Sequence, residues 1–124
     1  NEFSIINPII ISDVLKKISN EKNIKLKFPN DIFINKKKVC GILQEVINNE
    51  NKEFLIVGIG INVTANPVLN NIYNATNLSV ETNKNHQINE IVELIISSYE
   101  DFFNNIKSYD YIYYKKKANL MVIN

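Results

Sequence analysis

Apolar residues recur at helical spacing near the start of the sequence. The pattern predicts a helix over about residues 8–19 that ends at Asn20. Asn7 followed by Pro8 has the chemistry of an N-cap and a first helical position, which suits a start at that point. The apolar positions of this predicted helix are Ile10, Ile11, Val14, Leu15 and Ile18.

Strand-like patterns follow this helix. Residues 25–28 are predicted to be short and extended, because the residue before Pro29 is biased away from helix. Residues 32–34 predict a strand, and residues 35–36 suit a hairpin reversal. Apolar positions between 39 and 46 then predict the strand that returns.

A nearly unbroken apolar run occupies residues 54–61, after a second polar reversal at residues 48–52. Only Gly58 and Gly60 interrupt the run. Such a run predicts a central strand that is covered on both faces. The three consecutive strands therefore predict an antiparallel meander.

Two helices are predicted in the last third of the sequence. An Asn-rich loop over residues 64–85 precedes a strong apolar helical face over residues 88–103, and a further helix is predicted over residues 109–120. The order of elements is helix, three antiparallel strands, loop and two helices, which is an α+β arrangement. There is no internal repeat and no domain linker.

Composition narrows the class of protein. The 124 residues suffice for one domain, and 45% hydrophobic with 22% charged residues is ordinary for a globular protein. A net charge of +1 gives no reason to expect a nucleic-acid partner. A single cysteine excludes an internal disulfide and a multi-cysteine zinc site. With neither a leader nor a long apolar run visible, we expect a cytoplasmic domain with no membrane contact.

The glycine pair at 58 and 60 is the first candidate site. The sequence Gly-Ile-Gly-Ile-Asn lacks the third glycine of a dinucleotide fingerprint and the Gly-Lys-Ser/Thr of a phosphate loop. Glycines two residues apart in a strand lie on one face and leave backbone groups bare. Either a flat ligand approaches that face or a helix packs there, and spacing alone does not decide between them.

Residues 36–38, three lysines in succession, are the second candidate. By default such a run is a solvated hairpin tip. Lys38, however, directly precedes the returning strand, so its ammonium can be held near Gly41 as a fixed cation. A fixed cation beside bare backbone suits a carboxylate or phosphate ligand whose charge grows or moves during a reaction.

Other reactive side chains have simpler explanations. Asn30 and Asp31 follow a proline and suit a turn closed by their own side-chain hydrogen bonds. Cys40 is expected to be a small buried side chain rather than a nucleophile, because His86 lies in a polar loop with no evident partner. The sequence contains no Ser/His/Asp arrangement and no His/Cys metal spacing.

Three ordered motifs together resemble the catalytic domain of biotin protein ligases. They are Lys27-Phe28-Pro29-Asn30-Asp31, then Lys38-Val39-Cys40-Gly41-Ile42-Leu43-Gln44-Glu45, then Gly58-Ile59-Gly60-Ile61-Asn62-Val63. Relative to the family pattern, Phe28 replaces a Trp, and Cys40 stands where small residues such as Ala are usual. Lipoate ligases share the fold but match these motifs less well.

The resemblance implies a fold and a two-step reaction. The fold is a mixed or antiparallel sheet flanked by helices, similar to class II aminoacyl-tRNA synthetases. Biotin and ATP, with Mg²⁺, would give biotinyl-AMP and pyrophosphate. A lysine of a biotin carboxyl carrier protein, as in acetyl-CoA carboxylase or another biotin-dependent carboxylase, would then attack the mixed anhydride.

The resemblance also assigns site residues. Lys38 matches the lysine that neutralises the biotin carboxylate and the adenylate phosphate, and Asp31 is a candidate to activate the incoming lysine. The biotin pocket is implied at Lys38, Gly41, Leu43, Gly58, Ile59 and Gly60. The positions implied around ATP and the adenylate are Asn30, Asp31, Lys38 and Asn62. No metal ligand is directly assigned.

The resemblance covers only part of a ligase. We expect residues 1–124 to be a catalytic domain that lacks the upstream Gly/Arg-rich adenylate loop, since the sequence contains no Arg. We also expect it to lack the small C-terminal barrel, since the sequence stops where that barrel would begin. Three functions stay open: part of a biotin ligase, a non-catalytic remnant or interaction domain of the same fold, and a lipoate ligase-like acyl-adenylate enzyme. A homodimer is one option for its assembly.

Overall fold

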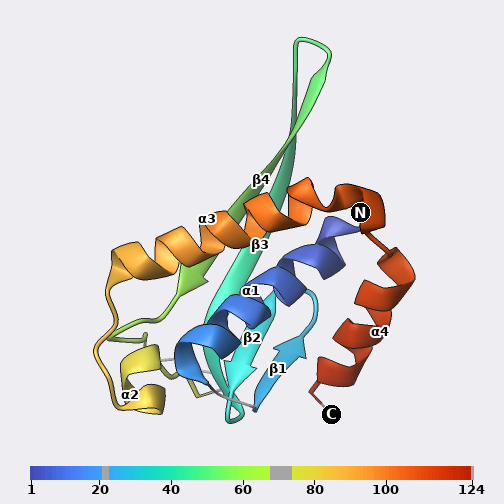
Figure 1. Ribbon diagram of the computed structural model, residues 1–124. Coiled ribbons are helices and arrows are strands. Elements are labelled where there is room, and N and C mark those ends of the chain that lie inside the picture. Colours follow the sequence, from blue (N-terminus) through green and yellow to red (C-terminus); the bar gives the residue numbers. More distant parts are fainter. Residues whose placement is uncertain (21–22, 68–73, 124) are drawn as a thin grey trace.

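A four-stranded antiparallel sheet forms the centre of the computed structural model, which describes residues 1–20, 23–67 and 74–123 (Figure 1). The strands lie in the order β1-β2-β3-β4, so the predicted meander is confirmed and residues 24–27 extend it by one strand. The elements are α1 (Phe3–Ser19), β1 (Ile24–Lys27), β2 (Asp31–Ile34), β3 (Lys37–Asn49), β4 (Lys52–Ile61), α2 (Leu78–Thr82), α3 (Ile88–Asn104), the 3₁₀ turn η1 (Ile106–Ser108) and α4 (Tyr111–Met121).

Helix α1 begins at Phe3, five residues before the predicted start, so the prediction that Asn7 caps this helix is wrong. The first turn is closed by Asn1 instead, whose Oδ1 accepts a hydrogen bond from Phe3 N at 2.8 Å. Asn7 and Pro8 both lie buried inside the helix. Proline is favoured at a helix start but does not exclude an earlier one, and here the buried apolar positions extend back to Ile6, which is 2% exposed.

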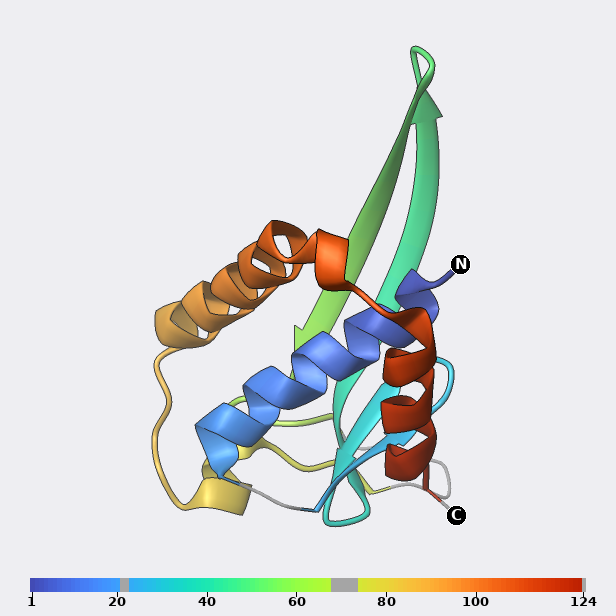
Figure 2. The same ribbon diagram turned by 45° about the vertical axis from the view of Figure 1, so that its right-hand side comes forward.

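Both predicted hairpin reversals are confirmed. Asn35 and Lys36 have φ values of 50° and 66°, and Glu50 and Asn51 have φ values of 49° and 65°. Two successive residues with positive φ are what a two-residue type I′ loop requires, because its twist matches that of the flanking strands. The second turn lies at the tip of a long β3–β4 hairpin that projects beyond the helices (Figures 1 and 2).

Strand β4 is at the edge of the described sheet, so the prediction of a central strand covered on both faces is wrong. Its burial alternates residue by residue: Val57, Ile59 and Ile61 pack against the core, while Ile56 is 48% exposed. An unbroken apolar run was misleading because the intervening positions on the outer face carry glycine or exposed apolar side chains.

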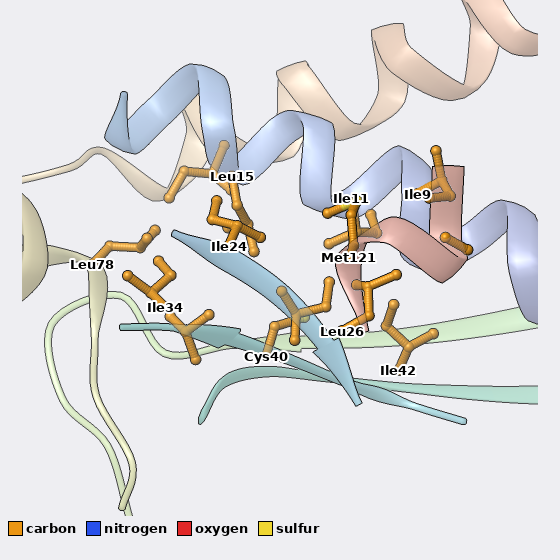
Figure 3. Close-up of a cluster of buried hydrophobic side chains, with 14 residues drawn as sticks. Ile9, Ile11, Leu15, Ile24, Leu26, Ile34, Cys40, Ile42, Leu78 and Met121 are labelled. Carbon is orange, nitrogen blue, oxygen red and sulfur yellow. The ribbon is translucent and has the colours of Figure 1, made fainter. Parts of the chain in front are cut away.

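The core lies between one face of the sheet and the helices. Helices α1, α3 and α4 all lie on that side, with α1 between the other two (Figures 1 and 2). Main-chain bonding also ties the end of α4 to the first strand, since Ile123 N donates to Leu26 O at 2.9 Å. Side chains that fill the core include Ile9, Ile11, Leu15, Ile24, Leu26, Ile34, Cys40, Ile42, Leu78 and Met121 (Figure 3).

The short helix α2 escaped the sequence analysis. Asn77 is its N-cap, and the Asn77 Oδ1 accepts a hydrogen bond from Val80 N at 2.9 Å. Five residues are too few for a helical repeat to show in the apolar pattern. None of the helices in the described segments is long and apolar enough to cross a membrane.

Asn7 ties α1 to β3 and α3. Its Nδ2 donates to Gln44 Oε1, and its Oδ1 accepts from Tyr99 Oη at 2.7 Å. Burial raises the pKa of the Tyr99 phenol, with a smaller contribution from Cys40, so the hydroxyl stays protonated and remains a donor. Because Asn7 is fully buried, loss of either hydrogen bond would lower the free energy of unfolding.

We predict that Asn7→Ala lowers the free energy of unfolding by about 1–3 kcal/mol, because Gln44 and Tyr99 are left with unsatisfied polar groups. Urea titration followed by circular dichroism measures the change. The matched control is Asn119→Ala on the exposed side of α4, which is expected to change stability by less than about 0.5 kcal/mol. Equal unfolding midpoints for the two variants would contradict the assigned role.

Candidate functional site

A β-bulge at Val39 sets the geometry of the site. Successive residues of β2 pair with Cys40 and then with Lys38, so Val39 has no partner on that strand. Side chains alternate along a regular strand, which would put residues 38 and 41 on opposite faces. The extra residue brings Lys38 and Gly41 to the same face and turns both Val39 and Cys40 into the core.

Lys38 is held at its backbone and at its ammonium group. Its N donates to Asn74 O at 2.8 Å, and its O accepts from Thr76 N at 2.8 Å. Its Nζ lies 3.1 Å from Asp31 Oδ1, and the two side chains are 33% and 26% exposed. Lys36 and Lys37 are exposed by contrast. Lys38 therefore differs from the solvated hairpin tip beside it.

Three glycines form a bare surface next to this ion pair. Gly41 pairs with Gly60 and Leu43 pairs with Gly58 across β3 and β4. A Cβ built on Gly41 would lie 3.7 Å from Lys38 Nζ and 3.9 Å from Asp31 Oδ1. The cation, the carboxylate and the bare backbone thus share one face of the sheet, opposite to α1.

Neither packing nor backbone conformation requires glycine at positions 58 and 60. A Cβ at Gly58 would meet Leu43 O at 3.8 Å, and one at Gly60 would meet Gly41 O at 3.9 Å, which are ordinary contact distances. Among the described residues no glycine has a positive φ, and no helix atom comes within 4 Å of either built Cβ. Within these residues, then, no helix packs on the glycine pair.

A pocket of about 280 Å³ opens beside Lys38, and Gly41, Gly60 and Asn62 also line it. The Asn62 side chain reaches the far wall, where its Nδ2 donates to Thr76 O at 3.0 Å. Ala75 completes that wall through a parallel bridge with Lys38.

Sequence reasoning missed Ala75 and also Pro67, another lining residue. Both lie in the Asn-rich loop, which carries no periodic signal. The length of the loop was the only signal that the sequence offered, since a long loop inside a compact domain often has a function.

Leu43 and Ile59 lie on opposite faces, although the family resemblance assigns both to the biotin pocket. Leu43 is 73% exposed beside Gly58, on the sheet face that carries Gly41, Gly58 and Gly60, here called the glycine face. Ile59 pairs with Ile42 and its side chain packs against the helix-covered core. Ile59 therefore presents only its main chain toward the glycine face, as the strand alternation requires.

Asn30 closes the turn before β2. Its O accepts from Ile42 N at 2.8 Å, and in the amide orientation that satisfies both side-chain atoms its Nδ2 donates to Ile42 O at 3.2 Å and Pro29 O at 3.1 Å. Asn30 lies in the turn, as expected, and its amide also bonds β3. Asp31 begins β2, and its side chain pairs with Lys38. The assignment of Asn30 to an adenylate site stays a prediction.

Cys40 is buried, as expected, and is a poor nucleophile. Burial raises the pKa of its thiol to about 12, outweighing the opposing effect of nearby Lys38. The expectation that His86 lacks a partner is wrong, because its Nε2 lies 2.6 Å from Thr82 Oγ1 in α2. No cluster of three or more metal-binding side chains occurs in residues 1–20, 23–67 and 74–123.

Comparison with known proteins gives the family. Residues 3–62 match the Biotin/lipoate A/B protein ligase family. This segment, just under half of the chain, is similar to that family. It contains α1 and the whole sheet, and it ends at Asn62 in the pocket beside Lys38.

Curated relatives agree with the family assignment. The chain is 51% identical to the bifunctional ligase/repressor BirA of Bacillus subtilis over 43 residues, which cover 34% of this chain and 13% of that protein. It is 26% identical to biotin–protein ligase 2 of Arabidopsis thaliana over 124 residues, which cover 86% of this chain and 36% of that protein. The matches therefore span only a minor part of each relative.

Solved structures extend the likeness to nearly the whole chain. The apo biotin protein ligase of Aquifex aeolicus is 28% identical with a TM-score of 0.79, covering 98% of this chain and 53% of that chain. The same enzyme in complex with biotin and ATP is 27% identical, also with a TM-score of 0.79, and is covered to 51%. LipL1 of Plasmodium falciparum with lipoate is a weaker match in fold, with a TM-score of 0.63 over 86% of this chain and 33% of that chain.

We predict that burial of Cys40 makes stability fall at high pH. The thiol pKa rises from 9.0 to about 12 on folding, so the folded state keeps a proton that the unfolded state releases between these values. The contribution of Cys40 is present below pH 9 and is lost as the pH rises toward 12. Urea titrations at several pH values compare the protein with Cys40→Ala. A difference in stability between them that does not change with pH would contradict this prediction.

Proposed function

We propose that this chain carries the biotin- and adenylate-binding face of an ATP-dependent biotin protein ligase. The observation that carries the proposal is Lys38, fixed beside the bare surface of Gly41, Gly58 and Gly60. The flat ring of biotin can approach backbone that no side chain covers. The Lys38 ammonium would then lie beside the ligand's carboxylate. The family match and the solved ligases with biotin, ATP and biotinyl-5-AMP support this choice of ligand.

In the first step a carboxylate oxygen of biotin attacks the α-phosphorus of ATP. A new P–O bond forms, the bond to the β-phosphate bridge breaks, and pyrophosphate leaves with its electron pair. Lys38 neutralises the carboxylate on binding and the phosphate as charge develops in the transition state. A lysine suits this task because its ammonium is a point charge on a flexible stem that can follow a moving phosphate.

In the second step an acceptor lysine attacks the carbonyl carbon of biotinyl-AMP. The C–N bond forms, the C–O bond to AMP breaks, and the amine loses a proton. Asp31 is the candidate to accept that proton or to orient the amine, because its carboxylate lies on the glycine face beside Lys38. Its ion pair with Lys38 also keeps the ammonium over Gly41.

The described residues supply few ligands for a metal ion. Asp31 is the carboxylate that pairs with Lys38, and the described residues contain no group of three side chains that would hold a metal. Mg²⁺ commonly binds through one or two carboxylates together with substrate phosphates. Asp31 therefore fits a Mg²⁺ that arrives with ATP, where the ion would supply charge neutralisation of the phosphates.

The acceptor in this proposal is a biotin carboxyl carrier protein or another biotin-dependent carboxylase, acting in the cytoplasm. Asn30 and Asn62 would bound the adenylate side, and Leu43 would contact the biotin side. Biotin is favoured over lipoate because the relatives above 25% identity that carry a substrate name are biotin ligases.

Calorimetric titration of the 124-residue protein tests the proposal. Biotin and then a non-hydrolysable biotinyl-AMP analogue are added, and saturable binding of the analogue is expected, tighter than that of biotin. The tighter binding follows because the analogue engages both the glycine surface and Lys38. No binding by a protein shown to be folded would contradict the proposal.

We predict that Lys38→Ala weakens binding of the analogue by about tenfold or more, since a bond to a charged group is worth about 1.5–3 kcal/mol. Lys36→Ala is the matched control, because that lysine is exposed at the hairpin tip. It is expected to leave the Kd unchanged within about twofold. Equal effects of the two variants would mean that Lys38 is an ordinary solvated lysine of the hairpin tip and would contradict its assigned role.

A further inference from the structure

Helix α3 carries an apolar stripe that stays largely exposed, although Phe103 also contacts Phe3 of α1. Ile88, Val92, Ile96 and Phe103 are spaced by four, four and seven residues, so they follow one side of the helix. Ile96 and Phe103 are each 53% exposed. All charged residues of α3 are acidic, namely Glu90, Glu93, Glu100 and Asp101.

The stripe borders an apolar groove of about 830 Å³ between α3, α1 and β4. Phe54, Val57 and Ile59 line its β4 wall, while Ile96 and Phe103 belong to its α3 wall. The charged residues of its lining are Glu53 and Glu100, both exposed. The groove therefore offers an apolar floor with a negative rim, which favours an amphipathic helix carrying lysine.

Helix α4 of the same chain presents the complementary chemistry. Ile112, Lys116 and Leu120 are spaced by four residues and therefore lie along one face. Ile112 is 65% exposed and Leu120 is 82% exposed. The charged residues within α4 are lysines 115–117, with no acidic residue among them.

The two helix faces match in order and in length. On α3 Glu100 lies between the apolar residues Ile96 and Phe103. On α4 Lys116 lies between the apolar residues Ile112 and Leu120 in the same way. At 1.5 Å rise per residue the apolar ends are about 10 Å apart on α3 and about 12 Å apart on α4. Within the described parts of the chain neither Glu100 nor Lys116 has an ion-pair partner, whereas Lys117 is bound to Asp13.

We propose that α4 of one copy docks against the α3 face of a second copy, with Lys116 beside Glu100 and Ile112 and Leu120 over the groove. The two surfaces lie on different sides of α1, so one copy cannot bring them together (Figures 1 and 2). Such a contact joins two different patches. It is head-to-tail and leads to open chains or rings rather than to a two-fold dimer. The proposal is independent of the ligase function.

Sedimentation velocity measures the mass of the protein at rising concentration, up to about 1 mM, the range of weak contacts. The unmodified protein is expected to grow beyond the dimer as concentration rises. Glu100→Lys and Lys116→Glu each place like charges in the contact and are expected to be monomeric. The matched controls Glu90→Lys and Lys84→Glu reverse exposed charges away from both faces and are expected to associate like the unmodified protein.

Mixing the two variants gives the sharpest test. In an equimolar mixture Lys116 of the Glu100→Lys copy meets Glu100 of the Lys116→Glu copy, and at the alternate contact the two substituted positions meet with their charges exchanged. Association beyond the dimer is therefore expected to return. A chain with both substitutions is expected to associate again, because the charges are exchanged. Circular dichroism establishes that every variant is folded.

Three results would overturn the proposal. The unmodified protein could remain monomeric throughout the concentration range. Its mass could instead stop at a dimer that both single variants also form, which would indicate a different, two-fold interface. Folded single variants that fail to combine on mixing would equally exclude the pairing of α3 with α4.

Discussion

The extra residue at Val39 is the feature on which the site depends. Without this bulge Lys38 and Gly41 would lie on opposite faces of β3, and the cation would be separated from the bare backbone. With it, the ammonium lies near Gly41 and pairs with Asp31, while Val39 and Cys40 both enter the core. The bulge thus fixes β3 in the core and directs the Lys38 side chain toward Gly41 and Asp31.

The sheet divides the molecule into two sides with different tasks. On one side α1, α3 and α4 cover β-strand residues such as Ile42 and Ile59, and the buried Asn7 connects helices to strand. On the other side Gly58 and Gly60 stay open, although methyl groups there would meet only ordinary contacts. Because stability does not demand these glycines within the described residues, the proposed ligand, which approaches the backbone, would account for them.

Local turn chemistry and side-chain spacing predicted much of the fold. Polar residues at 35–36 and 48–52 located both hairpins, and helical spacing located α3 and α4. The glycine pair and Lys38 pointed to one candidate site before any geometry was known, and the family resemblance was borne out by the match over residues 3–62.

The features that could not be predicted from the sequence depend on tertiary structure. The bulge follows from the pairing of two strands, the exposed edge of β4 follows from helices covering a single face, and the wall at Ala75 follows from a loop that returns to Lys38. The start of α1 was misplaced because Pro8 is normally a helix start, and burial overrode that preference. None of these effects has a local pattern to detect.

The most direct test of the central claim maps where a ligand touches the chain. Amide chemical shifts of the ¹⁵N-labelled protein are followed while the biotinyl-AMP analogue is added. We predict that the largest changes fall on Lys38, Gly41, Gly58 and Gly60, around the glycine face. Changes confined to the opposite side, at Asn7 and along α3, or no changes at all, would contradict the account.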